Sequence, residues 1–85
     1  ALQEHVNLYD VIIAQAASTN SNYVDQYQIP GHFAPIADFD LVTKAKHAAD
    51  NIGAVSHVGN VLSSDTFYNA DETFNDAWKK MGILG

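Results

Sequence analysis

The feature that most constrains the fold is a nearly continuous apolar run from Leu8 to Ala17, rich in β-branched residues and followed by polar turn formers. A half-solvated antiparallel strand alternates apolar and polar residues, so an unbroken run predicts a strand covered on both faces. Strands of that kind belong to parallel or mixed sheets. The run therefore predicts an α/β fold.

An amphipathic helix is predicted after residue 37. Apolar residues recur there at helical spacing, opposite lysines and an aspartate. Asp38 is placed to cap the amino end, and Asp40 lies in the first turn, where the helix dipole favours anions. Gly53 stands where a left-handed C-terminal cap is wanted.

A second strand and a second helix complete the predicted order. Residues 55–62 read as a strand, in which Gly59 marks a bulge or a close backbone approach. After a polar turn, a periodic apolar stripe predicts a helix capped by Asp71 and closed by Gly82. The apolar residues 83–85 resemble the entry to a further strand.

Residues 18–37 are predicted to be an irregular loop carrying Tyr23, Tyr27 and Phe33. A loop of about 20 residues is uncommon inside a compact domain unless it is functional or packs on a partner. The three rings would either anchor the loop against another subunit or cap the domain's own core. The sequence leaves both interpretations open.

Length and composition limit what the chain can be. At 85 residues and without cysteine, it has no disulfide to offset the ordering entropy, so residues 1–85 are expected to be an internal fragment of a single larger domain. The absence of cysteine and of a signal segment favours the cytoplasm. No apolar run approaches the roughly 20 residues that span a bilayer, which argues against a membrane protein.

Charge and motifs exclude several function classes. The net charge is −6 and there is no arginine, so nucleic-acid binding is not expected. The four histidines show no metal-ligand spacing, and no metal site is predicted. No nucleophile elbow and no glycine-rich phosphate loop occur, so no catalytic residue is assigned. Ser64, Phe67 and Tyr68 follow the second predicted strand, where α/β sheets bind ligands and aromatic rings can stack on a planar ligand such as a nucleobase. The two rings would otherwise fill the gap between the strand and the next helix, and the residue types alone leave both interpretations open.

Four blocks of sequence carry a family resemblance. They lie at Ile36–Leu41, Val58–Val61, Ser63–Tyr68 and Met81–Gly85. Their order and spacing resemble those of the bacterial hexameric type of purine nucleoside phosphorylase. The resemblance covers the whole chain. It implies a three-layer α/β/α domain with a central mixed sheet, assembled as a trimer of dimers.

The resemblance also implies an activity, in which a purine nucleoside and inorganic phosphate give a free base and a pentose 1-phosphate. Phosphate is a co-substrate and no cofactor is needed. Phe67 matches the base-stacking phenylalanine, Tyr68 lies beside it, and Ser64 matches a position near the base, where alanine is common. The phosphate-binding arginines, the ribose-binding segment and the proton donor match no residue of this chain, so the fragment alone is expected to be inactive.

Two alternatives remain. The chain would be an independent small α/β interaction module if its aromatic loop, residues 23–33, docked on a partner and the chain folded alone. A shift of the same family to nucleosidase or pyrimidine chemistry is also open, because the residues that choose between water and phosphate match nothing in these 85 residues.

Overall fold

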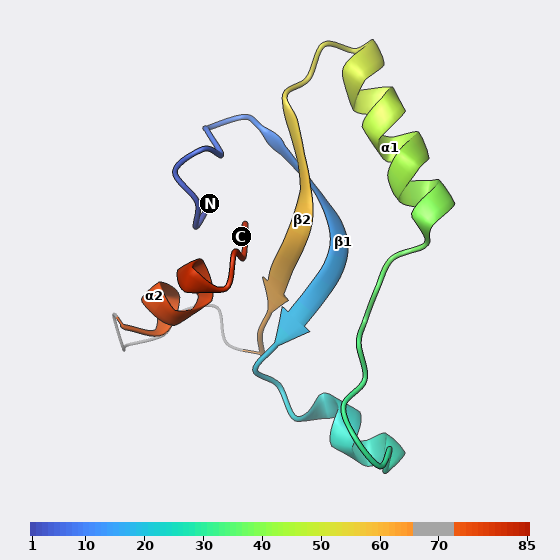
Figure 1. Ribbon diagram of the computed structural model, residues 1–85, viewed down its shortest axis with the longest axis vertical. Helices are drawn as coiled ribbons and strands as arrows, with labels where there is room; N and C mark the ends of the chain where they lie inside the picture. Colours follow the sequence, from blue (N-terminus) through green and yellow to red (C-terminus); the bar gives the residue numbers. More distant parts are fainter. Residues whose placement is uncertain (66–72) are drawn as a thin grey trace.

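The computed structural model describes residues 1–65 and 73–85. The two strands lie side by side at the centre, with α1 on one side and α2 and both termini on the other (Figure 1). This arrangement confirms the predicted α/β class. The elements in chain order are strand β1 (Val11–Thr19), the 3₁₀ helix η1 (Tyr23–Tyr27), helix α1 (Phe39–Asn51), strand β2 (Ser56–Ser63) and helix α2 (Thr73–Lys80).

The two strands pair in parallel, from Val11 opposite Ser56 to Thr19 opposite Ser63. The register shifts between Ala14 and Ala16, so β1 holds one extra residue, Gln15. The bulge thus lies in β1, across from Gly59. Gly59 is instead a site of close approach, because a Cβ there would lie 2.6 Å from Cδ1 of Leu84.

Short segments extend the sheet at both edges. On the outer edge of β1, Ala37 N donates to Gln15 O at 2.9 Å, and Ala16 and Ile36 form an isolated antiparallel bridge. On the outer edge of β2, Leu84 N donates to Asn60 O at 2.9 Å. The pairing is therefore mixed, because β1 is parallel to β2 and antiparallel to the segment at Ile36. The end of the chain lies along β2 as a further strand would.

Helix α1 begins as the sequence predicts. The backbone N–H of Leu41 donates to Asp38 Oδ2 at 3.0 Å, which satisfies one of the free amides of the first turn. Gly53 has φ +72°, the left-handed conformation expected after a helix. The apolar stripe packs only in part, because Ala49 is buried while Phe39 and Ile52 remain 79% and 80% exposed.

Helix α2 carries two aromatic members of the predicted apolar stripe. The rings of Phe74 and Trp78 meet edge to face, with centroids 6.2 Å apart. Gly82, just after the helix, has φ +80° and is followed by the buried Ile83. The predicted cap, Asp71, lies outside the described residues.

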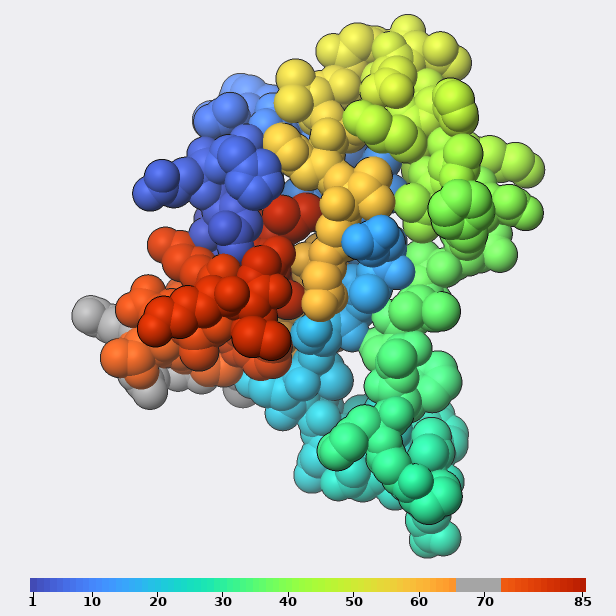
Figure 2. Space-filling view, in the orientation of Figure 1, coloured from blue at the N-terminus to red at the C-terminus, as the bar shows by residue number. Residues whose placement is uncertain are grey.

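The molecule is open for its size. Its accessible surface is 6752 Å², against about 4,900 Å² for a compact 9.2 kDa protein. The radius of gyration is 14.6 Å, against about 12 Å for a compact chain of this length. In the space-filling view, the segment of residues 20–37 projects from the rest (Figure 2). The buried apolar residues of the described parts are Val6, Ala49, Ile83 and Leu84.

Three interpretations of the sequence are corrected by these observations. β1 is not covered on both faces, since Val11, Ala14 and Gln15 are exposed and α1 is the helix that packs across both strands. Residues 18–37 are not wholly irregular, because they contain η1 and the bridge to β1. The loop's aromatic rings do not cap the core. Tyr23, Tyr27 and Phe33 are 65%, 60% and 61% exposed.

None of the helices in the described parts of the chain has the length and apolar character needed to cross a lipid bilayer.

Candidate functional site

The carboxyl ends of the two strands lie at the same edge of the sheet because the strands are parallel. β1 ends at Thr19 and β2 at Ser63, directly opposite each other. In open α/β sheets, ligands bind outside the carboxyl ends of the strands. This edge is therefore the first candidate for a binding site.

A reciprocal pair of hydrogen bonds joins the strands just before they end. The backbone N–H of Ser18 donates to Asn60 Oδ1 at 3.1 Å, and Asn60 Nδ2 donates to Ser18 Oγ at 2.8 Å. Both contacts are partly buried. The Asn60 side chain therefore satisfies two polar groups of the neighbouring strand at once and fixes where β1 lies relative to β2.

Hydroxyl groups continue this connection beyond the strands. Thr19 Oγ1 donates to the carbonyl oxygen of Ser63 at 2.7 Å and accepts from the backbone N–H of Ser21 at 3.0 Å. Ser21 Oγ donates to Asp65 Oδ2 at 2.7 Å. We call the contacts made by Ser18, Thr19, Ser21 and their partners on residues 60–65 the strand-exit network.

An open cavity of about 550 Å³ adjoins this network. Its volume falls within the roughly 300–1,000 Å³ range of small-molecule sites. The wall combines polar groups from the strand ends with apolar and aromatic side chains from the following loop and from α2. The polar and aromatic side chains in this wall include Ser18, Thr19, Asn60, His32, Phe33 and Trp78.

The predicted site residues are only partly within the described chain. Ser64 is described, is exposed and comes directly after the last residue of β2. It does not line the cavity wall. Phe67 and Tyr68 lie outside the described residues. The structure therefore brings Ser64 to the carboxyl edge of the sheet and leaves the two aromatic residues as predictions.

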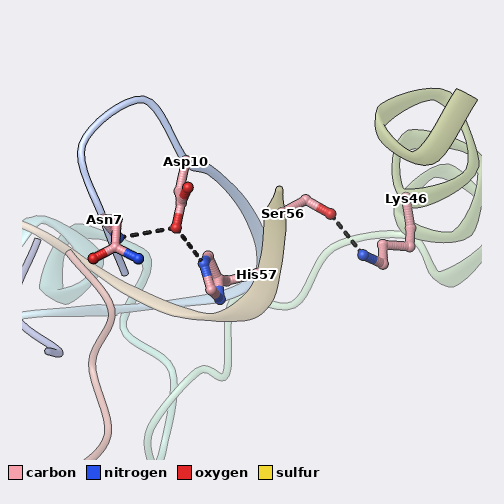
Figure 3. Close-up of polar contacts among 5 residues, drawn as sticks. All are labelled: Asn7, Asp10, Lys46, Ser56 and His57. Carbon is pink, nitrogen blue, oxygen red and sulfur yellow. Dashed lines mark hydrogen bonds and ion pairs between the residues drawn. The ribbon is translucent and has the colours of Figure 1, made fainter. Parts of the chain in front are cut away.

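At the opposite, amino-terminal end of the strands, a carboxylate is hydrogen-bonded to a histidine. His57 Nε2 lies 2.9 Å from Asp10 Oδ2, and the two side chains are 19% and 9% exposed. The His57 hydrogen bond, followed by that from the backbone N–H of Asn7, holds the pKa of Asp10 below its usual value of 3.8. Asp10 lies between these two donors (Figure 3). The pair joins the start of β1 to the start of β2.

Other polar contacts at that end support the fold. Lys46 reaches from α1 to Ser56 Oγ at 2.7 Å (Figure 3). It also lies 3.2 Å from Asp50 Oδ1. The rings of His5 and His57 meet edge to face with centroids 5.3 Å apart, so the histidines are less scattered than the sequence suggests. Within residues 1–65 and 73–85, no group of three or more histidines and carboxylates is placed to hold a metal ion.

The strand-exit network is a feature that the sequence did not predict. In the sequence, its members are typical only of turns or strands. Polar residues at the ends of two parallel strands could nevertheless have indicated contacts between them. Asn60, between the apolar residues of the middle of β2, is the sharper clue. A partly buried amide requires partners, and the neighbouring strand supplies them.

The chain is similar to proteins named DeoD-type purine nucleoside phosphorylase. The protein of Streptococcus pneumoniae (strain CGSP14) is 49% identical over 69 residues, which are 81% of this chain and 29% of that protein. The protein of Streptococcus thermophilus (strain ATCC BAA-491 / LMD-9) is 48% identical over 69 residues, with the same shares covered. The chain thus spans less than a third of the length of these relatives.

The match to the family is more extensive than the match to any of these relatives. The family model described as the phosphorylase superfamily matches residues 1–85, the full length of the sequence. The parallel pair of strands with a crossover helix is consistent with that match. By this full-length match, the chain belongs to the phosphorylase superfamily.

Proposed function

We propose that residues 1–85 are an internal part of a longer purine nucleoside phosphorylase. That enzyme converts a purine nucleoside and inorganic phosphate into a free base and a pentose 1-phosphate. The observation that carries the proposal is the 49% identity, over 69 residues, to a relative named for this activity. We call that longer enzyme, which contains this chain and is expected to have the length of the relatives, the full-length protein.

The chain's contribution is part of the pocket for the purine base. Phe67 stacks on the base, Tyr68 lies beside it, and Ser64 is close to its edge. The position of Ser64 at the carboxyl end of β2 supports this assignment, because ligands of α/β sheets bind at that end. Stacking suits a purine, since every base offers a π-face to an aromatic ring.

The groups that drive bond cleavage are supplied from outside the chain. Phosphorolysis requires an anion to be held in position and the charge on the departing base to be neutralised. Bidentate anion clamps are usually arginines, and this sequence has none; its strong cations are Lys44, Lys46, Lys79 and Lys80. The chain alone is therefore inactive. The enzyme uses phosphate as co-substrate and needs no metal or organic cofactor.

The full-length protein works in the cytoplasm as a homo-oligomer, a trimer of dimers, and binds neither nucleic acid nor membrane. The exposed rings of Tyr23, Tyr27 and Phe33 support the assembly, because aromatic side chains on a projecting segment are typical of subunit contacts. The net charge of −6 supports the lack of nucleic-acid binding.

The test is the release of hypoxanthine from inosine by the purified full-length protein. The proposal expects release that depends on added phosphate, and none from the 85-residue chain assayed in parallel. Release of hypoxanthine without phosphate would indicate that the enzyme hydrolyses the nucleoside instead. The proposal would be overturned if the full-length protein cleaved none of inosine, adenosine and guanosine in the presence of phosphate. Activity of the isolated chain would contradict the claim that the groups driving bond cleavage lie outside it.

An independent interaction module is the other candidate, favoured only by the exposed aromatic rings of residues 23–33. Such a module must fold alone, and the large surface of 6752 Å² counts against it. Circular dichroism and size-exclusion chromatography of the isolated chain separate the two. A cooperative monomer would support the module, whereas an aggregating or molten chain supports the enzyme fragment.

A further inference from the structure

Ser64 lies between two residues that are each hydrogen-bonded to the end of β1 or the residues just after it. On one side, the carbonyl oxygen of Ser63 accepts from Thr19 Oγ1 at 2.7 Å. On the other side, the carboxylate of Asp65 accepts from Ser21 Oγ at 2.7 Å. Ser64 is therefore flanked by two residues that are held from 44 positions earlier in the chain, Ser63 through its backbone carbonyl and Asp65 through its side chain.

The hydroxyl groups that hold it have defined orientations. Thr19 Oγ1 accepts from the backbone N–H of Ser21 and so has its own hydrogen free for Ser63. Ser21 Oγ accepts from the backbone N–H of Tyr23 and has its hydrogen free for Asp65. Each hydroxyl thus has one donor and one acceptor role, and hydrogen bonds to a carboxylate are the stronger kind.

This arrangement exceeds what the strands need in order to pair. The backbone ladder between β1 and β2 ends at Thr19 and Ser63, yet the side-chain contacts continue to Asp65, two residues further. The Asn60 amide already fixes the register at Ser18. The contacts of Thr19 and Ser21 therefore act on the placement of the residues after β2, which begin with Ser64.

We infer that Thr19 and Ser21 are positioning residues that hold Ser64 at the purine base. The inference rests on the proposed function, in which Ser64 is close to the edge of the base. Neither side chain needs to touch the nucleoside. Both act by fixing the residues on each side of Ser64, so their loss weakens binding of the nucleoside and leaves phosphate binding unchanged.

The experiment measures kcat and the KM values for inosine and phosphate in the full-length protein. Ser21→Ala and Thr19→Val should each raise the KM for inosine about three- to tenfold, the effect of losing the one hydrogen bond that reaches a neighbour of Ser64, with kcat and the phosphate KM unchanged. Ser21→Thr keeps a hydroxyl and should restore most of the loss. Thr43→Val is the matched control, because the Thr43 hydroxyl bonds to Phe39 O within α1, away from the strand ends.

A double-mutant cycle tests the route of the effect. If Ser21 acts through Ser64, adding Ser21→Ala to Ser64→Ala should raise the inosine KM less than it does in the wild-type background. If Ser21→Ala lowers the yield of folded protein, Asp65→Asn tests the same contact more gently, with a smaller rise expected. The melting temperature of each variant separates a general loss of stability from a specific loss of binding.

Two results would overturn the inference while leaving the proposed function intact. One is an active wild-type protein whose inosine KM is unchanged in both folded variants. The other is an equal loss for inosine and phosphate, which would indicate a purely structural role. A wild-type protein without phosphate-dependent cleavage would instead contradict the proposed function, and this inference would fall with it.

Discussion

The two ends of the parallel sheet are held together by different chemistry. At the amino end, a hydrogen bond between the Asp10 carboxylate and His57 joins the start of β1 to the start of β2. At the carboxyl end, neutral amide and hydroxyl groups form the connection, and only its last contact, to Asp65, involves a charge. The amino end is therefore sensitive to pH, and the carboxyl end is sensitive to the shape and hydrogen-bonding capacity of its side chains.

This difference suits different tasks. The ionised Asp10 carboxylate accepts from two donors, so the contribution of the amino end depends on pH. A chain of hydroxyl hydrogen bonds is directional and fixes the positions of the groups it joins. The carboxyl end, where ligands of α/β sheets bind, has such a chain. The comparison assigns a pH-dependent contact to the amino end and a fixed geometry to the carboxyl end.

The largest expected effect on stability is at the carboxyl end. Asn60→Leu removes both side-chain partners of Ser18 and leaves partly buried polar groups unsatisfied. We expect the free energy of unfolding of the full-length protein to fall by about 1–3 kcal/mol in urea titrations. Asn60→Asp is the control, because its carboxylate can accept from both Ser18 groups. An Asn60→Leu variant as stable as the wild type would show that the amide is dispensable.

A smaller and pH-dependent effect is expected at the amino end. Asp10→Asn keeps the shape of the side chain and removes its charge. Because the folded pKa of Asp10 lies below its usual value of 3.8, its ionised form stabilises the fold at higher pH. The advantage of the wild type over Asp10→Asn is thus complete well above 3.8 and disappears as the pH falls through the folded pKa.

Urea unfolding across this acidic range measures the difference. Glu4→Gln, at an exposed position near the same end, removes an equal charge and serves as the control. A difference between wild type and Asp10→Asn that stays constant from neutral pH down to about pH 3 would contradict a role for the Asp10 charge.

The smallest effect is expected for the contact between α1 and the sheet. Lys46→Met removes the bond to Ser56 and the ion pair with Asp50, in which the lysine and aspartate side chains are 42% and 56% exposed. Exposed pairs of this kind contribute about 0.2–1 kcal/mol, and we expect a loss in that range. Lys44→Met on the same helix is the comparison. A loss far above about 1 kcal/mol would show that Lys46 stabilises the fold by more than an exposed ion pair does.

Local physics explains which parts of the fold were predictable. The Asp38 cap and the left-handed Gly53 were correctly predicted because each depends on a few neighbouring residues. The apolar character of residues 83–85 predicted the entry to a further strand, and the structure shows that they lie along β2. The short helix η1 and the bridge from Ile36 to β1 were missed, because the sequence of residues 18–37 carries no clear period.

The side-chain contacts at the strand ends depend on register, which the sequence does not show. The extra residue, Gln15, shifts the pairing by one position, and this shift places Thr19 opposite Ser63. Without the bulge, different residues would face each other beyond that point. The sequence could therefore indicate that the carboxyl edge is polar and that Ser64 lies there, but not which hydroxyl bonds to which partner.

The most direct test of the account is the dissociation constant of inosine for the full-length protein after Phe67→Ala. If the carboxyl end carries the base site and Phe67 stacks on the purine, affinity should fall by about 1–3 kcal/mol, or roughly 5- to 150-fold. Phe39→Ala, which makes the same change on α1, should leave affinity unaltered. An unchanged dissociation constant in a folded Phe67→Ala variant would contradict the assignment of the base pocket to this edge of the sheet.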